Sequence, residues 1–212
     1  MREGNLGDSI QMFRFLTDSN PLSPLSCAFF LITAFVGSGI AHTLWLRSKM
    51  SRRFAIPLDG GLTFRQRRIL GDNKTVRGLM VIIPGTGCSF YLLGIFTNLN
   101  PGLFEGVWAL SPASFGLLGL IAGVGFMLGE LPNSFIKRQL GILPGEAAEG
   151  LLKKVVFVVI DRVDSLLGML LAISLAVPTP WQVWMYVILS GPFIHWFFSY
   201  MLFILKVKGR AA

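Results

Sequence analysis

The sequence predicts an all-α integral membrane protein with five transmembrane helices. Hydrophobic residues make up 53% of the 212 residues and charged residues 14%, and the mean hydropathy is +0.64, far from the composition of an average soluble domain. A helix needs about 20 mostly apolar residues to cross a bilayer core. Five stretches provide them: residues 22–46, 78–97, 112–135, 155–177 and 181–205. We therefore predict a polar N-terminal segment, residues 1–21, and a single membrane-embedded domain, residues 22–212.

The first predicted span, residues 22–46, has Trp45 near its end, where an interfacial aromatic residue belongs. A polar segment with nine basic residues, residues 47–77, follows it. The PLDGG sequence at Pro57–Gly61 predicts a turn, because proline, aspartate and paired glycines favour turns. A solvated loop that sets the orientation of the chain would explain the basic residues alone.

The end of this segment, GDNKTVRG at Gly71–Gly78, runs directly into the second predicted span, residues 78–97. It holds three residues able to cap a helix and two cations: Asp72, Asn73, Thr75, Lys74 and Arg77. The first free N–H groups of the helix would face the same compartment as these cations. A helix N-terminus and two cations at one place predict an anion site suited to phosphates.

The loop at residues 98–111 contains no basic residue, and we expect its Phe104 and Trp108 to lie at the membrane interface. The third predicted span, residues 112–135, follows. It carries two pairs of glycines four residues apart, Gly119/Gly123 and Gly125/Gly129. Small residues at this spacing predict a close approach of another helix.

Polar residues gather at the end of the third span. Glu130, Ser134 and Lys137 fall on one helix face, and Asn133 and Arg138 stand beside them. An ordinary amphipathic helix end would give the same pattern. We favour a binding site, because a second polar cluster follows in the next span.

The fourth predicted span, residues 155–177, contains Asp161, Arg162 and Asp164. The apolar run after Asp164 is too short to cross a membrane at about 1.5 Å per residue, so these residues lie inside the span. The two aspartates share a helix face, and paired carboxylates resist burial unless a cation lies between them. The alternative is a solvated helix end with an Asp–Arg pair. We predict a divalent-cation site at Asp161 and Asp164.

The distribution of basic residues predicts the topology. Residues 47–77, 137–154 and 206–210 together hold 16 of them, whereas the stretch before the first span holds two. The positive-inside rule then places the N-terminus outside the cell membrane and the C-terminus in the cytoplasm. All three polar clusters would emerge on the cytoplasmic side.

Paired carboxylates, several cations and a helix N-terminus together favour a site for Mg²⁺ and a polyphosphate. Phosphoryl and nucleotidyl transfer need charge neutralisation and in-line positioning more than acid–base chemistry. A site at the membrane edge implies that one substrate is a lipid phosphate. The net charge of +8 is then explained by orientation and phosphate-bearing partners, and nucleic acid is not predicted.

Several of these motifs resemble a known family. The S-x-x-K-R pattern at Ser134–Arg138, Pro144–Gly145 and DRVD at Asp161–Asp164 are similar to the signature of the CDP-diacylglycerol synthases. The Lys-Asp pair and the Gly-His-Gly-Gly run of that signature are absent. From Pro57 to Gly168 the chain is more similar to the shorter CDP-archaeol synthases, through PLDGG, GDNKTVRG, GELPNSFIKRQLGILPG and DRVDS.

This resemblance implies a five-helix enzyme that joins CTP to a lipid phosphate, releases pyrophosphate and leaves a CDP-activated lipid. It implies that Asp161 and Asp164 bind Mg²⁺. The residues expected to be catalytic are Asp161, Asp164, Lys74, Arg77 and Lys137. The residues expected to bind substrate are Asp72, Asn73, Glu130, Asn133, Ser134 and Arg138.

Two other functions compete with this one. A CDP-alcohol phosphatidyltransferase would share the metal and the membrane interface, but its run of four acids over two helical turns is missing. A transporter or non-catalytic lipid-binding protein would place its polar residues near the midplane and often show repeated halves. The sequence does not choose between an isoprenoid ether and a diacyl lipid, and a homodimer is compatible with it.

Overall fold

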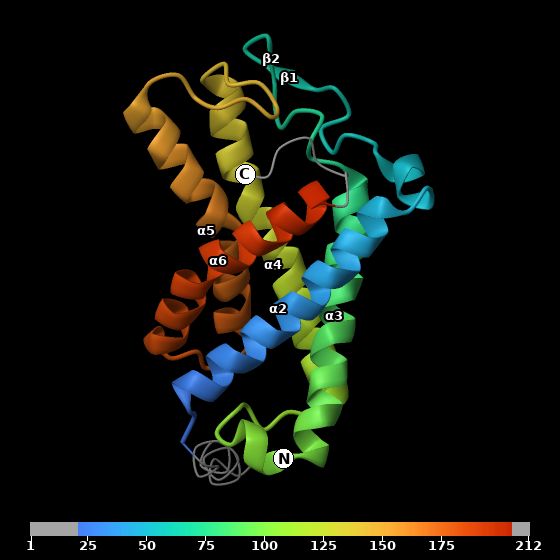
Figure 1. Cartoon of the computed structure of the whole chain (residues 1–212), viewed down its shortest axis with the longest axis vertical. Coiled ribbons are helices and arrows are strands. Elements are labelled where there is room, and N and C mark those ends of the chain that lie inside the picture. The colour runs from blue at the N-terminus through green and yellow to red at the C-terminus, as the bar shows by residue number, and fades with distance from the viewer. Residues whose placement is uncertain (1–20, 205–212) are drawn as a thin grey trace, which may run out of the picture.

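The computed structural model describes residues 21–204, and the predicted N-terminal segment and basic tail lie outside this range except for Pro21. A long helix is present at each of the five predicted spans (Figure 1). In chain order these are α2 (Pro24–Arg47), α3 (Val76–Leu99), α4 (Pro112–Gln139), α5 (Leu151–Ala176) and α6 (Trp181–Ile204). The fold class is therefore confirmed as predominantly helical.

Three of the helices, α2, α3 and α4, are long and apolar enough to cross a membrane. Helix α5 is outside this set because Asp161, Arg162 and Asp164 interrupt its apolar run. Serine caps begin two of the three: the hydroxyl groups of Ser23 and Ser111 accept from the N–H groups of Ser26 and Ser114. The membrane crossing of α5 and α6 stays a prediction.

Helix α4 is the centre of the bundle, since it packs along both α3 and α5. The contact with α5 is close because Gly125 and Gly129 of α4 face Gly168 of α5. A Cβ atom added to Gly168 would lie 2.3 Å from the carbonyl oxygen of Gly125 and 2.6 Å from the Cα atom of Gly129. The predicted close packing at these glycines is confirmed. This packing also fixes the position of the polar half of α5 relative to the end of α4.

We predict that Gly168→Ala strongly destabilises the protein, because its methyl group would have to displace the α4 backbone. Overpacking of this kind costs about 1–3 kcal/mol or more. Thermal unfolding in detergent should show a clearly lower Tm. Gly102→Ala is the matched control, since a Cβ atom there meets no described atom within 4 Å. Equal Tm values for the two variants would contradict the packing argument.

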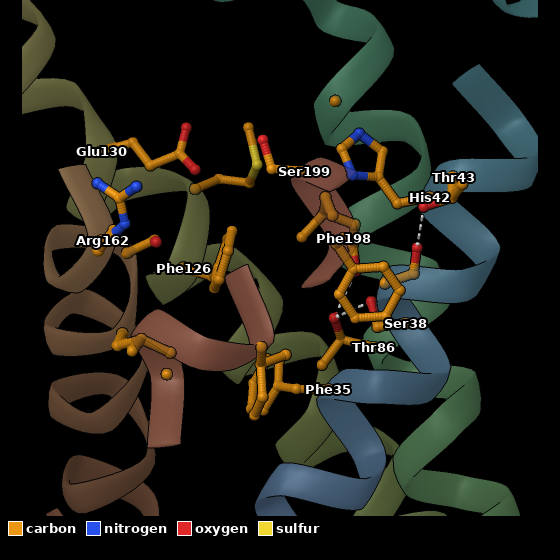
Figure 2. A pocket seen from close by; sticks show the side chains of 18 of the residues that line it. Phe35, Ser38, His42, Thr43, Thr86, Phe126, Glu130, Arg162, Phe198 and Ser199 are labelled. Carbon is orange, nitrogen blue, oxygen red and sulfur yellow. Dashed lines mark hydrogen bonds between the residues drawn. The ribbon is translucent and has the colours of Figure 1, made fainter. Parts of the chain in front are cut away.

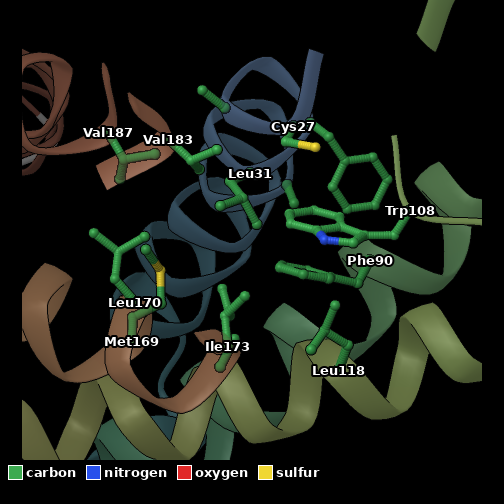
Figure 3. Close-up of a cluster of buried hydrophobic side chains, with 14 of the residues drawn as sticks. Cys27, Leu31, Phe90, Trp108, Leu118, Met169, Leu170, Ile173, Val183 and Val187 are labelled. Carbon is green, nitrogen blue, oxygen red and sulfur yellow. The ribbon is translucent and has the colours of Figure 1, made fainter. Parts of the chain in front are cut away.

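The main apolar core lies where α2, α3, α4, α5 and α6 meet the loop after α3 (Figure 3). Phe104 and Trp108 are part of this core, with 6% and 5% of their surface exposed. The structure thus places both side chains inside the protein core, and their position relative to the membrane interface stays a prediction. Both rings pack edge-on against Phe30, and the Trp108 indole N–H donates to the Pro178 carbonyl at 2.7 Å, so the polar atom of the buried ring is satisfied.

The segment between α2 and α3 folds back over one end of the bundle. It contains the short helix η1 (Met50–Phe54) and a hairpin of β1 (Thr63–Phe64) and β2 (Arg67–Arg68), while η2 (Pro101–Phe104) lies in the loop after α3. The predicted turn at Pro57–Gly61 is present. It is held to the start of α3 by backbone hydrogen bonds from Leu58 to Lys74 and from Val76 to Ile56. The loop therefore carries Lys74 to the site.

Candidate active site

Three polar clusters that are far apart in the sequence meet at one end of the bundle. Lys74, just before α3, forms an ion pair with Glu130 of α4. About two turns further along α4, Lys137 forms an ion pair with Asp161 of α5. Between these pairs, Asn133 contacts α5 as well. The structure thus brings together the start of α3, the end of α4 and the first half of α5, as the sequence predicted.

The two aspartates of α5 lie side by side across a single amide group. Asn133 Nδ2 donates to Asp161 Oδ1 at 2.6 Å and to Asp164 Oδ2 at 2.8 Å. The ammonium group of Lys137 contacts both oxygens of Asp161, and the other oxygen of Asp164 accepts from the Ser165 N–H at 2.7 Å. The positions around the carboxylates are therefore taken by donors, which indicates a place where positive charge is stabilised.

Two aspartates alone do not enclose a metal ion. Within residues 21–204, no group of three or more His, Cys, Asp or Glu side chains converges on one point. However, Asn133 Oδ1 is buried and has no described hydrogen-bond partner. A half-turn of this amide would turn its oxygen toward the carboxylates. Two carboxylates and an amide oxygen fit Mg²⁺, which takes oxygen ligands and commonly completes its shell with water and substrate phosphates.

A cavity of about 400 Å³ opens beside this cluster, between all five helices (Figure 2). Its polar end is lined by Asn73, Lys74, Arg77, Glu130 and Arg162. Its body is lined mainly by apolar side chains, which include Ile32, Phe35, Phe126, Met127, Leu166 and Val187. Ser38 and Thr86, two buried polar residues of this wall, satisfy each other through a hydrogen bond of 2.9 Å. The cavity therefore suits a molecule with a charged head and an apolar body.

Arg138 lies at the end of α4 and is 6% exposed. Its Nε and Nη1 atoms are buried and have no hydrogen-bond partner among the described residues. The loop at Gly71 lies directly against it, since a Cβ atom on Gly71 would be 3.3 Å from Arg138 Cδ. A buried guanidinium group without partners is costly, so Arg138 is a strong candidate to bind an anionic ligand.

The comparisons with known proteins point to one family. The family model of the CarS-like CDP-archaeol synthases matches residues 47–210. The chain belongs to the CDP-archaeol synthase family. The matched residues include all three polar clusters described above.

Three relatives illustrate the range of similarity. The CDP-archaeol synthase of Halobacterium salinarum is 34% identical over 126 residues, which are 58% of this chain and 61% of that protein. That of Thermofilum pendens is 32% identical over 156 residues, covering 72% and 64%. That of Saccharolobus islandicus is 28% identical over 156 residues, covering 72% and 80%. The chain thus spans about three fifths of the Halobacterium relative.

A solved structure of an intramembrane enzyme for archaeal membrane lipid biosynthesis has the same fold. The TM-score is 0.54 and the sequence identity 20%, and the alignment covers 84% of this chain and 95% of that one. At this identity the likeness supports the fold alone. It agrees with a membrane protein whose helices form one bundle.

Most residues predicted for the site of this family member lie together, but Asp72 does not. Its side chain is 72% exposed and pairs with Arg68 at 2.8 Å, on the outer side of the loop. One of the three predicted capping residues is found at the start of α3. Thr75 takes the cap position of α3, but no side chain makes the capping hydrogen bond. Ser134 is buried on α4 beside Asn133.

Sequence reasoning missed two residues that line the cavity of this CDP-archaeol synthase family member. Arg162 was assigned no role, yet its side chain lies at the polar end of the cavity next to Glu130 (Figure 2). His42 of α2 also lines the cavity. A charge inside an apolar span was a signal for Arg162, because such residues usually face a polar interior. Nothing comparable marks His42.

Proposed function

We propose that this protein transfers a cytidylyl group from CTP to a lipid phosphate within the membrane and releases pyrophosphate. The observation that carries the proposal is the cavity with a basic rim and an apolar body, which ends beside two paired carboxylates. A phosphate oxygen of the lipid would attack the α-phosphorus of CTP. The bond from the α-phosphorus to the bridging oxygen breaks, and pyrophosphate carries that oxygen and its electron pair away.

The cations divide into two groups that suit the two substrates. Lys74, Arg77 and Arg162 stand at the rim of the apolar cavity, so we assign them to the lipid phosphate. Lys137 contacts the Asp161 carboxylate, and Arg138 lies against the loop at Gly71. We therefore assign both to the triphosphate. An arginine can hold two phosphate oxygens in its planar fork, whereas a lysine acts as a point charge.

The residues that would hold Mg²⁺ are Asp161 and Asp164, with Asn133 able to add an oxygen. When bound, Mg²⁺ would neutralise the charge of the transferring phosphates and orient them. Lys137 already offsets the charge of Asp161 in the ligand-free protein. It would be free to turn to the triphosphate when another cation takes its place. Asn73 and Glu130, at the cavity rim, would orient the substrates.

The lipid we propose is an isoprenoid ether phosphate, because the relatives are named CDP-archaeol synthases. The test incubates the purified protein with CTP, Mg²⁺ and either the ether or the diacyl lipid phosphate. We expect a CDP-lipid and pyrophosphate, with a higher kcat/KM for the ether lipid. Consumption of a CDP-lipid in place of CTP would favour a phosphatidyltransferase, and no product with any lipid phosphate would overturn the proposal.

We further propose that the protein resides in the cell membrane with α5 and α6 as spans, the N-terminus outside and the active site in the cytoplasm. The sixteen-to-two distribution of basic residues supports this orientation. A membrane-impermeant thiol reagent on intact cells should label Glu105→Cys and not Thr63→Cys, both exposed positions, in a Cys88→Ser background. The opposite labelling pattern would invert the topology. Gly106 is unsuitable as a probe position, since a Cβ atom there would lie 2.7 Å from Ser23.

A further inference from the structure

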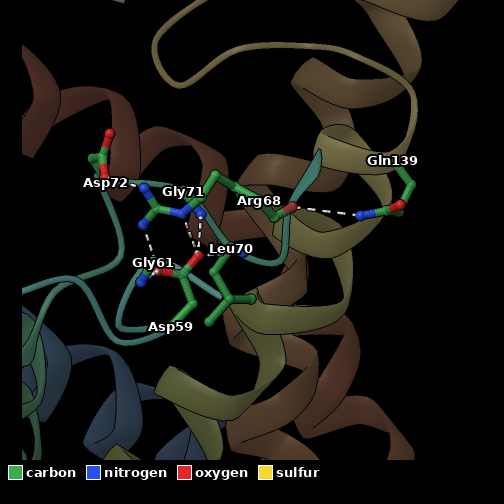
Figure 4. A network of polar contacts seen from close by, with 7 residues as sticks. All are labelled: Asp59, Gly61, Arg68, Leu70, Gly71, Asp72 and Gln139. Atoms are coloured by element: carbon green, nitrogen blue, oxygen red, sulfur yellow. Dashed lines mark hydrogen bonds and ion pairs between the residues drawn. The ribbon is translucent and has the colours of Figure 1, made fainter. Parts of the chain in front are cut away.

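The loop between α2 and α3 is tied together by one buried carboxylate, that of Asp59 (Figure 4). Its side chain is 1% exposed. Arg68 donates to it from Nε at 3.2 Å and from Nη2 at 2.5 Å. The backbone N–H groups of Gly61, Leu70 and Gly71 donate to it at 3.2, 3.0 and 3.1 Å. Five donors therefore converge on two oxygens, and they come from both arms of the β1–β2 hairpin.

These contacts keep the carboxylate ionised. The Arg68 guanidinium holds the pKa of Asp59 far below its ordinary value, and the three backbone donors lower the pKa further against the opposing effect of burial. A lowered pKa in the folded state means that the charge stabilises the fold above the unfolded pKa, which is about 4. That stabilisation is lost only as the pH falls below this value, so the contacts of Asp59 with its five donors are intact at neutral pH.

The loop between α2 and α3 contacts one cation from each of the two groups assigned to the substrates, Lys74 and Arg138. On one side, the Leu58 N–H next to Asp59 donates to the Lys74 carbonyl at 2.8 Å, and the Lys74 side chain reaches the cavity. On the other side, Gly71 has a φ of +90°, a conformation that favours glycine, and lies against Arg138. Displacement of the loop would therefore move Lys74 and uncover Arg138.

We propose that Asp59 is a positioning residue, which acts through Lys74 and Arg138 and does not touch substrate itself. This inference rests on the proposed cytidylyltransferase function, because the phosphates held by the two cations define the position that matters. The PLDGG turn thereby has a role that its turn-forming residues alone did not indicate. Its aspartate holds the loop between α2 and α3 in place beside the two cations.

The first test is the steady-state kinetics of Asp59→Asn in the full-length protein. The variant keeps the size of the side chain and loses its charge. We expect the KM for the lipid phosphate to rise about tenfold or more while kcat changes less. A purely structural role would lower the amount of active enzyme and leave KM unchanged. Glu149→Gln, which removes an exposed carboxylate just before α5, is the control and should match the parent in both parameters.

The second test asks whether Asp59 acts through Lys74. In a Lys74→Ala background, Asp59→Asn should cause little additional loss in lipid-phosphate affinity, because residues that act as a unit are not additive. Fully additive losses, or a parental KM in the single variant, would overturn the proposal.

Hydrogen exchange of residues 69–75 is a third measurement that needs no substrate. Asp59→Asn should expose the amides of Leu70 and Gly71, and Glu149→Gln should not. Unchanged exchange in Asp59→Asn would also overturn the proposal. If the parent itself transferred nothing to lipid phosphates, the proposed function would fail instead, and the exchange result would decide the role of Asp59 in the loop.

Discussion

Asp161→Asn and Asp164→Asn should each lower kcat on the order of 100-fold or more, while the proteins still insert and purify normally. Asparagine keeps the shape of the side chain but removes the negative charge that a divalent cation requires, and stabilisation of this kind commonly carries such factors. The Asp161 side chain is 41% exposed, so loss of its ion pair should change the Tm little. Steady-state turnover of CTP across a range of Mg²⁺ concentrations is the measurement.

The control for these aspartates is Glu105→Gln, which removes an exposed carboxylate in the loop after α3, away from the site. It should retain the turnover of the parent at every Mg²⁺ concentration. The metal role would fail if both aspartate variants kept near-parental turnover when Mg²⁺ is limiting. A loss that excess Mg²⁺ partly restores would support weakened metal binding directly.

The helices and the convergence of their polar ends could be predicted from the sequence because both depend on local signals. Apolar runs of about 20 residues set the spans, and spacings of three and four residues set which side chains share a face. Asn133, Lys137 and Asp161 therefore came together as expected. The glycines of α4 likewise carried their packing role in their spacing.

Contacts made through irregular backbone could not be predicted in the same way. Arg68 reaches Asp59 because Arg65 and Gln66 turn the hairpin with φ values of 51° and 64°, although tight hairpin turns of this hand usually contain glycine or asparagine. The same Arg68 draws Asp72 away from the site. No residue spacing announces such a turn, so Asp72 looked like a site residue.

Burial was the other property that the sequence did not reveal. Trp108 stands in a short loop without basic residues, from which only an interfacial position was predicted, yet the loop folds back and the indole joins the core. Arg138 was expected to bind substrate, but its sequence context did not indicate that the side chain is buried with two unpaired nitrogen atoms. In both cases the neighbours that cover the side chain come from distant segments.

The unpaired guanidinium of Arg138 leads to a prediction in which stability and activity change in opposite directions. Arg138→Met replaces a buried cation by an apolar chain of similar length, and such replacements often stabilise a protein. The ligand-free variant should therefore have a Tm a few degrees higher, since 1 kcal/mol corresponds to about 2–4 °C at this size. Turnover should fall on the order of 100-fold, because the triphosphate loses a planar, two-pronged donor.

Two further variants make the Arg138 argument specific. Arg138→Lys keeps the charge but not the planar fork, so it should also lose activity. Arg68→Met removes a guanidinium group that does have a carboxylate partner, and its Tm should fall. If Arg138→Met lowered the Tm as Arg68→Met does, the guanidinium would be a structural group, and its unpaired nitrogen atoms would not mark a phosphate site. A stabilised protein that has lost transfer to lipid phosphate is the result expected of a residue kept for its ligand.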